Sequence, residues 1–375
     1  MSPARAKKSR IKVVAERRTG ILPAQAIRCL IEDGTIGIEK PLVEKQLQPA
    51  SLDLRLGRVA YRVRASFLPG PGTKVRQRLE ALTMHEIPLV DGAVLETGCV
   101  YVVPLQESLE LPRHMSAATN PKSSTGRLDV FTRVIADGVS TFDQVPAGYQ
   151  GPLWAEICPQ TFPVLVRTGS RLSQIRFRSG EIEHDDTALR ELHRKQKLVS
   201  ATSADIADGI AVSVDLSGGA DGLVGYRARH HTGLVDVDAV GACAIADYWD
   251  PIPAHKSRRI VLDPNEFYIL ASKEAVHVPP THAAEMVPFN PLVGEFRVHY
   301  AGFFDPGFGH DAAGGKGSRA VLEVRSHKVP FVLEDGQIIG RLIYEPLTEI
   351  PDMLYGQGLG SHYQAQGLKL SKHFK

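Results

Sequence analysis

The sequence predicts a mainly β protein built from two tandem copies of one domain, with a few short helices. Short segments rich in β-branched and aromatic residues, such as CVYVVPL, GPLWAEI and QIIGRLIY, recur along most of the chain. The 34 glycines and 25 prolines supply the turns between them. Short strands separated by Gly and Pro are typical of a compact all-β fold rather than of an alternating α/β sheet.

The evidence for duplication is a constant spacing between similar segments. LETGCVYVVPLQESLELP (residues 95–112) resembles LDPNEFYILASKEAVHVP (residues 262–279), at an offset of 167. The same offset places Glu156 of GPLWAEI on Glu323 of SRAVLEV. Further upstream, SLDLRLG matches SVDLSGG at an offset of 162. A spacing held over so many residues predicts two domains of about 160 residues each, a usual size for a single domain.

The repeat and the composition between its copies give the domain boundaries. LPAQAIRCLIEDGTI has apolar residues at helical spacing and ends in Asp-Gly, so it predicts a helix at the start of the first copy. After Pro346 the chain becomes a polar, glycine-bearing tail that would be disordered if taken alone. We therefore expect a basic flexible tail at 1–20, a first domain at 21–180, a linker at 181–204 and a second domain with its C-terminal tail at 205–375.

Composition excludes several classes of protein. No apolar run approaches the roughly 20 residues that a membrane helix needs, so no membrane partner is expected. The net charge is only +2, which gives no bias towards nucleic acid. The four cysteines fit neither a disulfide framework nor a Cys-x-x-Cys metal clip, and the basic N-terminus lacks the apolar core of a signal peptide. We expect reduced thiols and a cytoplasmic protein.

Glu323 is the first candidate functional residue. It stands in the apolar segment AVLEV, on the face that period-2 alternation shares with Val321. A carboxylate on such a face is costly unless the face meets solvent or the charge is paired or used. The repeat of the pattern at Glu156 favours a role for the carboxylate.

A second candidate is the hydroxyl-rich loop PKSSTGR. It gathers Lys122, Ser123, Ser124 and Arg127 into six residues. Hydroxyls and backbone N–H groups at a turn, with an Arg able to form two parallel hydrogen bonds, suit a phosphate or another oxyanion. Taken alone, a Ser-Ser-Thr-Gly run is more often an ordinary loop.

Together these segments resemble the dCTP deaminase family of the dUTPase-like superfamily. PKSSTGR (121–127) is similar to the family's Arg-Ser-Ser-x-Ala-Arg loop, and FFDPGFG (303–309) to its Asp-Pro-Gly turn. AVLE (320–323) is similar to its Val-Leu-Glu strand, and HYQAQG (362–367) to its C-terminal Lys-Tyr-Gln-x-Gln segment. QLQPASLDLRLG also resembles its N-terminal strand. The resemblance implies two dUTPase-like domains of the β-clip, or distorted jelly-roll, type.

The two copies depart from the family pattern in complementary ways. The second copy has VPFNPL (287–292) where the serine loop should stand, without hydroxyl or Arg. The first copy has VPAGY (145–149) where Asp-Pro-Gly should stand, although Glu156 is present. Because the family builds its site between neighbouring subunits, we expect a composite site. The first copy would supply the serine loop, and the second would supply the turn, Glu323 and the tail.

The resemblance also implies the role of each residue. Glu323 would act as general base and proton shuttle, and Ser123 and Arg127 would position or polarise the water and the leaving amine. The residues expected to bind the nucleotide are Lys122 and Ser124 at the phosphates, Asp305 and Val321 at the sugar or base, and Tyr355, His362 and Gln366 in the closing tail. No protein metal ligand is expected, Mg²⁺ would arrive with the triphosphate, and no zinc would be required.

Hydrolysis of dCTP to dUTP and ammonia is therefore the expected activity, and dCTP and dUTP are the expected ligands of a homo-oligomer. Two alternatives remain within the superfamily, a dUTP pyrophosphatase and a bifunctional deaminase that releases dUMP. A nucleotide-binding regulator without catalysis is the alternative from another class. The sequence does not decide whether the composite site lies within one chain or between chains, nor whether Glu156 forms a second site.

Overall fold

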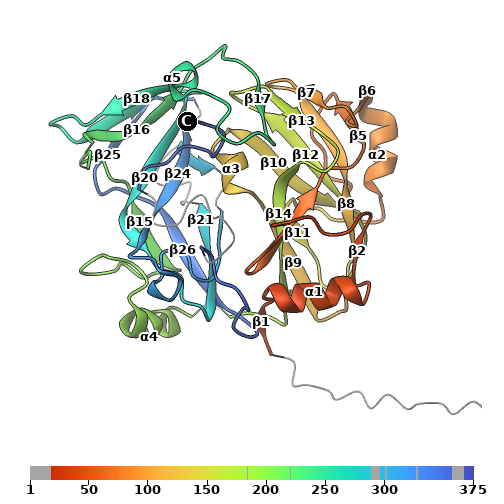
Figure 1. Ribbon diagram of the computed structural model, residues 1–375, viewed down its shortest axis with the longest axis horizontal. Helices are drawn as coiled ribbons and strands as arrows, with labels where there is room; N and C mark the ends of the chain where they lie inside the picture. Colours follow the sequence, from red (N-terminus) through yellow and green to blue (C-terminus); the bar gives the residue numbers. More distant parts are fainter. Residues whose placement is uncertain are drawn as a thin grey trace, which may run out of the picture.

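The computed structural model describes residues 18–183, 185–219, 221–288, 296–299, 302–326, 328–356 and 367–375, with side chains omitted for Pro288 and 296–299. Figure 1 shows two β-rich halves lying side by side, with the N-terminal half in red to yellow and the C-terminal half in green to blue. The predicted mainly β class is confirmed. All four cysteines are free of disulfides, and no helix in these ranges is long and apolar enough to cross a bilayer.

The first copy is built from two antiparallel sheets and a small third one. One sheet has the order β11 (Gln144–Val145), β9 (Met115–Pro121), β14 (Arg171–Ser179), β4 (Ser51–Arg55) and β3 (Leu47–Gln48), with β1 (Gly20–Ile21) beside β14. The other has the order β10 (Val130–Ala136), β12 (Gln150–Pro159), β8 (Val100–Glu110), β5 (Val59–Val63) and β6 (Thr83–Pro88), with β2 (Ile36–Ile38) beside β8. Apolar side chains from both sheets form one core between them.

The second copy repeats this plan. One sheet has the order β15 (Ile210–Ser213), β26 (Ile338–Pro346), β21 (His282–Pro288) and β23 (Phe303–Phe304). The other has the order β18 (Trp249–Pro253), β16 (Leu223–Ala228), β20 (Phe267–Val276), β24 (Ser318–Ser326) and β22 (Phe296–His299). β19 (Arg259–Leu262) pairs with β25 (Phe331–Glu334). A second core lies between the two larger sheets.

Strand register supports the duplication at the offset of 167. Glu156 on β12 lies opposite Val102 on β8, and Glu323 on β24 lies opposite Ile269 on β20. Each member of the second pair follows its counterpart by 167 residues. The repeated carboxylates therefore occupy equivalent positions in the two copies.

The upstream match at an offset of 162 is wrong by four residues. Leu52 of β4 lies opposite Ile175 of β14, whereas Ile210 of β15 lies opposite Leu342 of β26. Since Ile175 and Leu342 are 167 apart, the counterpart of Leu52 is Ile210, at an offset of 158. A shift of four residues keeps every side chain on the same face of a strand, so the apolar pattern does not reveal it.

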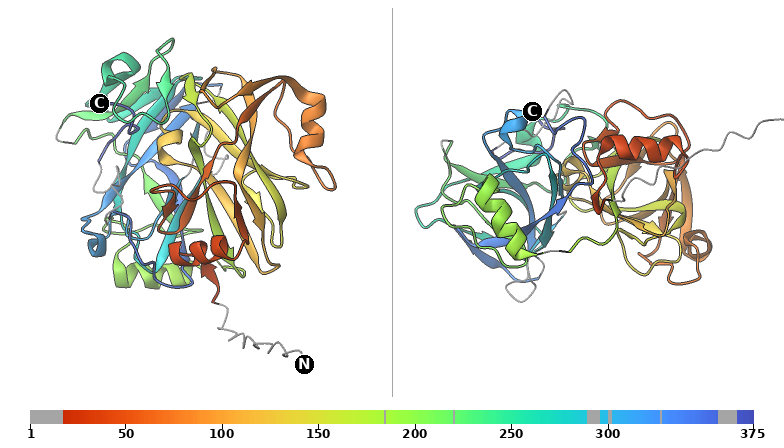
Figure 2. Two further views of the ribbon diagram at one scale, coloured as in Figure 1. Left: turned by 45° about the vertical axis from the view of Figure 1, so that its right-hand side comes forward. Right: turned by 90° about the horizontal axis from the view of Figure 1, so that it is seen from below.

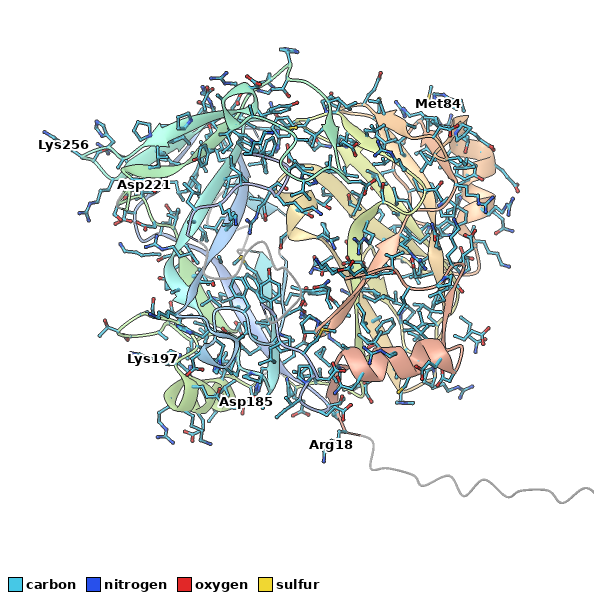
Figure 3. The ribbon with its side chains drawn as sticks, viewed as in Figure 1. Arg18, Met84, Asp185, Lys197, Asp221 and Lys256 are labelled. Carbon is cyan, nitrogen blue, oxygen red and sulfur yellow. The ribbon has the colours of Figure 1, made fainter. Side chains whose placement is uncertain are left out.

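Each of the helices in the described ranges connects two strands that are consecutive in the chain. They are α1 (Ala24–Glu32), α2 (Val75–Leu82), α3 (Ser123–Gly126), α4 (Asp186–Gln196), α5 (Ile245–Tyr248) and a 3₁₀ turn at Asp311–Ala313. The helix expected near residue 27 is α1, whereas α2 was not expected. Figure 3 labels Asp185 and Lys197 at the two ends of α4. The Asp185 carboxylate accepts hydrogen bonds from two backbone N–H groups, and Lys197 ends the helix in the left-handed conformation, at φ 48°.

A third apolar cluster joins the copies. The small sheet β7 (Ala93–Leu95), β13 (Val164–Val166) and β17 (Val235–Asp236) takes its last strand from beyond the linker. Beside it, the rings of Phe162 and Trp249 lie 5.4 Å apart, and Phe374 packs 5.6 Å from Trp249. The end of the chain, expected to be disordered on composition alone, is therefore fixed at residues 367–375 because Phe374 reaches this cluster. Figure 2 shows the two halves in contact along this boundary.

Candidate active site

Glu323 lies on β24, an interior strand next to the edge of its sheet, at the boundary between the copies. β20 flanks this strand on one side and β22 on the other. Val321, on the same face, packs into the apolar cluster that joins the copies. Glu323 is only 5% exposed, so this face of the strand meets the first copy rather than solvent.

The serine loop is a single tight turn between β9 and β10. Lys122 is extended, and α3 begins directly after it at Ser123. The N–H groups of Thr125 and Gly126 donate to the Lys122 carbonyl, and the N–H of Arg127 donates to the Ser123 carbonyl. This turn places Arg127 at its end, on the side that faces the second copy. Figure 1 shows α3 where the two halves meet.

Arg127 and Glu323 meet across this boundary within one chain. The Nε of Arg127 lies 3.8 Å from Oε1 of Glu323, and both side chains are less than a tenth exposed. Nη1 of Arg127 also donates to the Lys369 carbonyl at 3.0 Å, which ties the guanidinium to the C-terminal segment. The serine-loop cation of the first copy and the carboxylate of the second are thus brought together.

The surroundings of Glu323 change its acidity. Burial raises the pKa of its carboxyl to about 8, while the Arg127 guanidinium and a hydrogen bond from backbone act in the opposite direction to a smaller extent. A group with this pKa can gain or lose a proton near neutral pH. Such a carboxyl is suited to proton transfer, which is most effective when the pKa of the group is close to the working pH.

Asp305 of the Asp-Pro-Gly turn is held by an arginine from the first copy. Nη2 of Arg176 lies 3.3 Å from Oδ1 of Asp305, and the same guanidinium donates to the carbonyls of Ala284 and Phe304. Burial raises the pKa of Asp305, and Arg176 opposes that shift. The loop that follows needs glycine at 309, where φ is +64° and a Cβ would lie 2.1 Å from the Val276 carbonyl oxygen.

Lys122 and Ser124 have protein partners in the structure. Lys122 forms an ion pair with the fully buried Asp53, whose carboxylate also lies 3.4 Å from Nη1 of Arg171. The Ser124 carbonyl accepts a hydrogen bond of 2.8 Å from the hydroxyl of Ser371. A phosphate at Lys122 would therefore have to displace Asp53, or bind beside it to Lys122 and Arg171.

The remaining expected site residues are those of the C-terminal tail. The Tyr355 N–H donates to the Pro306 carbonyl at 2.8 Å, and its ring packs 5.6 Å from Phe308, beside the Asp-Pro-Gly turn. His362 and Gln366 lie outside the described residues. Asp53, Arg176, Lys369 and Ser371 were not expected at the site. Asp53 and Arg176 could have been identified because each places a charge in a largely apolar strand segment, SLDLRLG and SQIRF.

Glu156, the counterpart of Glu323, is paired within its own copy. Nη2 of Arg133, from the adjacent strand β10, lies 2.5 Å from Oε1 of Glu156. The Arg133 guanidinium also lies 3.4 Å from the centre of the Phe142 ring. The two carboxylates are thus equivalent in register but different in surroundings.

The described residues contain no cluster suited to hold a metal ion through protein side chains alone. Within those ranges, no group of three or more His, Cys, Asp or Glu side chains lies close enough to share one.

The raised pKa of Glu323 predicts how stability changes when its charge is removed. The pKa is about 8 in the folded chain against an ordinary 4.5, so the folded protein holds a proton that the unfolded chain releases. Stability therefore falls as pH rises through this window. Glu323→Gln removes the ionisation, and its melting temperature relative to wild type should increase from pH 6 to pH 9, by about 2 °C or more.

Differential scanning calorimetry at both pH values measures this effect, with the exposed Glu349→Gln as the control. A Glu323→Gln difference that stays constant with pH, or decreases, would contradict the raised pKa.

Comparison with known proteins places the chain in a family. The family model for the "2'-deoxycytidine 5'-triphosphate deaminase (DCD) N-terminal domain" matches residues 18–181, and that for the C-terminal domain matches residues 185–374. The crystal structure of 2'-deoxycytidine 5'-triphosphate deaminase from Agrobacterium tumefaciens is 60% identical to this chain, with a TM-score of 0.85, over 88% of this chain and 100% of that one.

Curated relatives match a shorter part of the chain. The "dCTP deaminase" of Natronomonas pharaonis is 32% identical over 161 residues, which cover 42% of this chain and 79% of that protein. The "dCTP deaminase, dUMP-forming" of Methanobrevibacter smithii is 28% identical over 162 residues, with the same coverage. The two family models together span nearly the whole sequence, and the chain belongs to the dCTP deaminase family.

Proposed function

We propose that the protein hydrolyses dCTP to dUTP and ammonia, with Glu323 as general base and proton shuttle. One observation carries the proposal. Glu323 is a buried carboxyl with a pKa raised to about 8, and it faces Arg127 from the other copy. Membership of the family and the names of the relatives support the choice of substrate.

The chemistry requires a carboxylate that first takes a proton and then returns it. Ionised Glu323 would accept a proton from water as the water oxygen bonds to C4 of the cytosine ring. It would pass that proton to the ring nitrogen, then move the second proton from the new hydroxyl to the amino group. The C4–N bond breaks, and ammonia leaves. Arg127 and Ser123 would orient the water and the leaving group.

We propose that this reaction needs no zinc. Zinc-dependent deaminases carry a His-x-Glu and a Pro-Cys-x-x-Cys signature, and the sequence contains neither. Mg²⁺ would enter with the triphosphate, whose oxygens supply most of its non-water ligands.

The nucleotide would bind between the copies. Asp305 and Val321 would contact the sugar or base, Lys122 and Ser124 the phosphates, and Tyr355, His362 and Gln366 would close over it. The expected homo-oligomeric state and cytoplasmic location belong to the same proposal.

A second candidate is a deaminase that continues to dUMP. The Methanobrevibacter smithii relative is named a dUMP-forming dCTP deaminase, which favours this candidate. Incubation with dCTP and Mg²⁺, followed by separation of the products, distinguishes the possibilities. dUTP with ammonia supports the first candidate, dUMP with pyrophosphate supports the second, and unchanged dCTP supports a nucleotide-binding regulator.

Glu323→Gln should abolish deamination while nucleotide still binds. The substitution keeps the shape of the side chain and removes the base, and loss of a general base costs about 10²- to 10⁴-fold in rate. Glu156→Gln is the matched control and should leave the rate close to wild type, since Glu156 is paired with Arg133. Ammonia release measures both variants. A Glu323→Gln rate above roughly a tenth of wild type, or equal damage at both positions, would contradict the assignment.

The pH dependence of the reaction should follow Glu323. kcat/KM reports the ionisation of the free enzyme, and the base is active only when ionised. kcat/KM for dCTP should therefore fall as pH decreases below about 8. Initial rates between pH 6 and pH 9 test this expectation, with Glu156→Gln as the control for a general pH effect. A profile that is flat across this range would exclude Glu323 as the titrating base.

The composite site should be inactivated from either copy and should not recover on mixing. Ser123→Ala and Arg127→Ala are each expected to cripple the reaction that Glu323→Gln abolishes. Because Arg127 meets Glu323 within one chain, a mixture of Ser123→Ala and Glu323→Gln chains, refolded together, should remain inactive. Recovery of activity in that mixture would mean that the working site is shared between chains.

A further inference from the structure

Two ion pairs cross between the copies beside Glu323. Arg127 of the first copy reaches Glu323 of the second. Two residues further along each segment, the charges are reversed, and Arg325 of the second copy pairs with Asp129 of the first. The segments 127–129 and 323–325 are therefore joined by two oppositely directed pairs.

Asp129 is fixed in both its backbone and its side chain. It has a φ of 55°, a left-handed conformation that Asp and Asn tolerate better than most residues. Its N–H donates to the Gly126 carbonyl at 2.9 Å, which closes the turn that carries Arg127. Its carboxylate is 1% exposed and accepts a hydrogen bond of 2.6 Å from the hydroxyl of Thr161. The direction of the turn is thus tied to the position of this carboxylate.

Arg325 is engaged by protein groups. It lies on β24 two residues after Glu323, hence on the same face of the strand. Besides Asp129, its guanidinium donates to the Thr161 hydroxyl at 3.0 Å and to the Asn265 carbonyl. With its side chain 14% exposed, Arg325 connects the catalytic strand to the serine loop.

The two pairs differ in closeness. Asp129 and Arg325 are in direct contact, whereas Nε of Arg127 lies 3.8 Å from Oε1 of Glu323, beyond the usual 2.7–3.2 Å of an N–H···O hydrogen bond. A closer Arg127 would favour the ionised carboxylate and make it a weaker base. We propose that Asp129 and Arg325 form a positioning pair that fixes Arg127 opposite Glu323 across the boundary between the copies. The inference rests on the proposed role of Glu323.

The test is the charge-neutral double variant Asp129→Asn with Arg325→Gln. Asn keeps the shape and the left-handed tolerance of Asp, and removing opposite charges together leaves the net local charge unchanged. Without the pair, the turn that carries Arg127 can shift and bring its guanidinium closer to Glu323, and water gains access to the boundary. Both changes lower the pKa of Glu323, because burial is the main cause of its rise.

We expect two kinetic effects when the double variant is compared with wild type. The plateau of kcat should fall roughly 10- to 100-fold, as for a small misplacement of catalytic groups. The acid limb of kcat/KM should move to lower pH by about half a unit or more. Carboxyl ¹³C NMR, with the Glu323 signal assigned by its loss in Glu323→Gln, should show the same shift without any turnover.

The matched control is Arg178→Gln with Glu345→Gln. This pair also joins the copies, with Nε 2.8 Å from Oε1, and its side chains are 20% and 2% exposed. This control variant should lower the melting temperature without moving the acid limb of kcat/KM or the titration of the Glu323 NMR signal.

The outcomes are distinct. The inference would be overturned if the double variant had the wild-type kcat plateau, the wild-type acid limb of kcat/KM and the wild-type titration of the Glu323 NMR signal. It would also be overturned if the control pair shifted the acid limb by the same amount. Wild-type protein that does not deaminate dCTP would instead defeat the proposed function, while the NMR titration still tests the pair. If the double variant does not fold, Asp129→Asn alone should shift the resonance in the same direction, and a folded Asp129→Asn with the wild-type titration would overturn the inference.

Discussion

The buried contact between Arg127 and Glu323 is the constraint on which the rest of the site depends. A carboxyl on an interior strand, 5% exposed, would be very costly if it were ionised without compensation. The structure meets this cost in two ways. Burial raises the pKa of Glu323 to about 8, so the carboxyl is mostly neutral at lower pH, and Arg127 stands nearby when it ionises. The same balance gives the carboxyl a pKa suited to proton transfer near neutral pH.

That contact also explains why neither copy carries the full set of site motifs. The arginine comes from the turn after β9 and the carboxylate from β24, which belong to different copies. Within the first copy, Glu156 is paired with Arg133 instead. The duplicated chain thus brings together, in one polypeptide, a cation of the first copy and a carboxylate of the second. Arg176 repeats the arrangement at Asp305, where a first-copy guanidinium again holds a second-copy carboxylate.

The sequence predicted the elements better than their pairing. Alternation and the repeat identified the mainly β class, β24 and Glu323, because strand periodicity is a local property. The four-residue error upstream arose because such a shift preserves the same periodicity. Asp129 and Arg325 are 196 residues apart, and a single sequence gives no means of matching charges over that distance. The tail at 367–375 was misjudged for the same reason, since Phe374 is held by Phe162 and Trp249 far from it in sequence.

We propose that the two unequal copies form one nucleotide site in each chain. Isothermal titration calorimetry of the Glu323→Gln protein with dCTP and Mg²⁺ tests this most directly, since substrate binds without being consumed. We expect one nucleotide per chain, and the same stoichiometry when Glu156→Gln is added to the variant. Two nucleotides per chain, with the second lost on the added Glu156→Gln change, would contradict it and assign a working site to each copy.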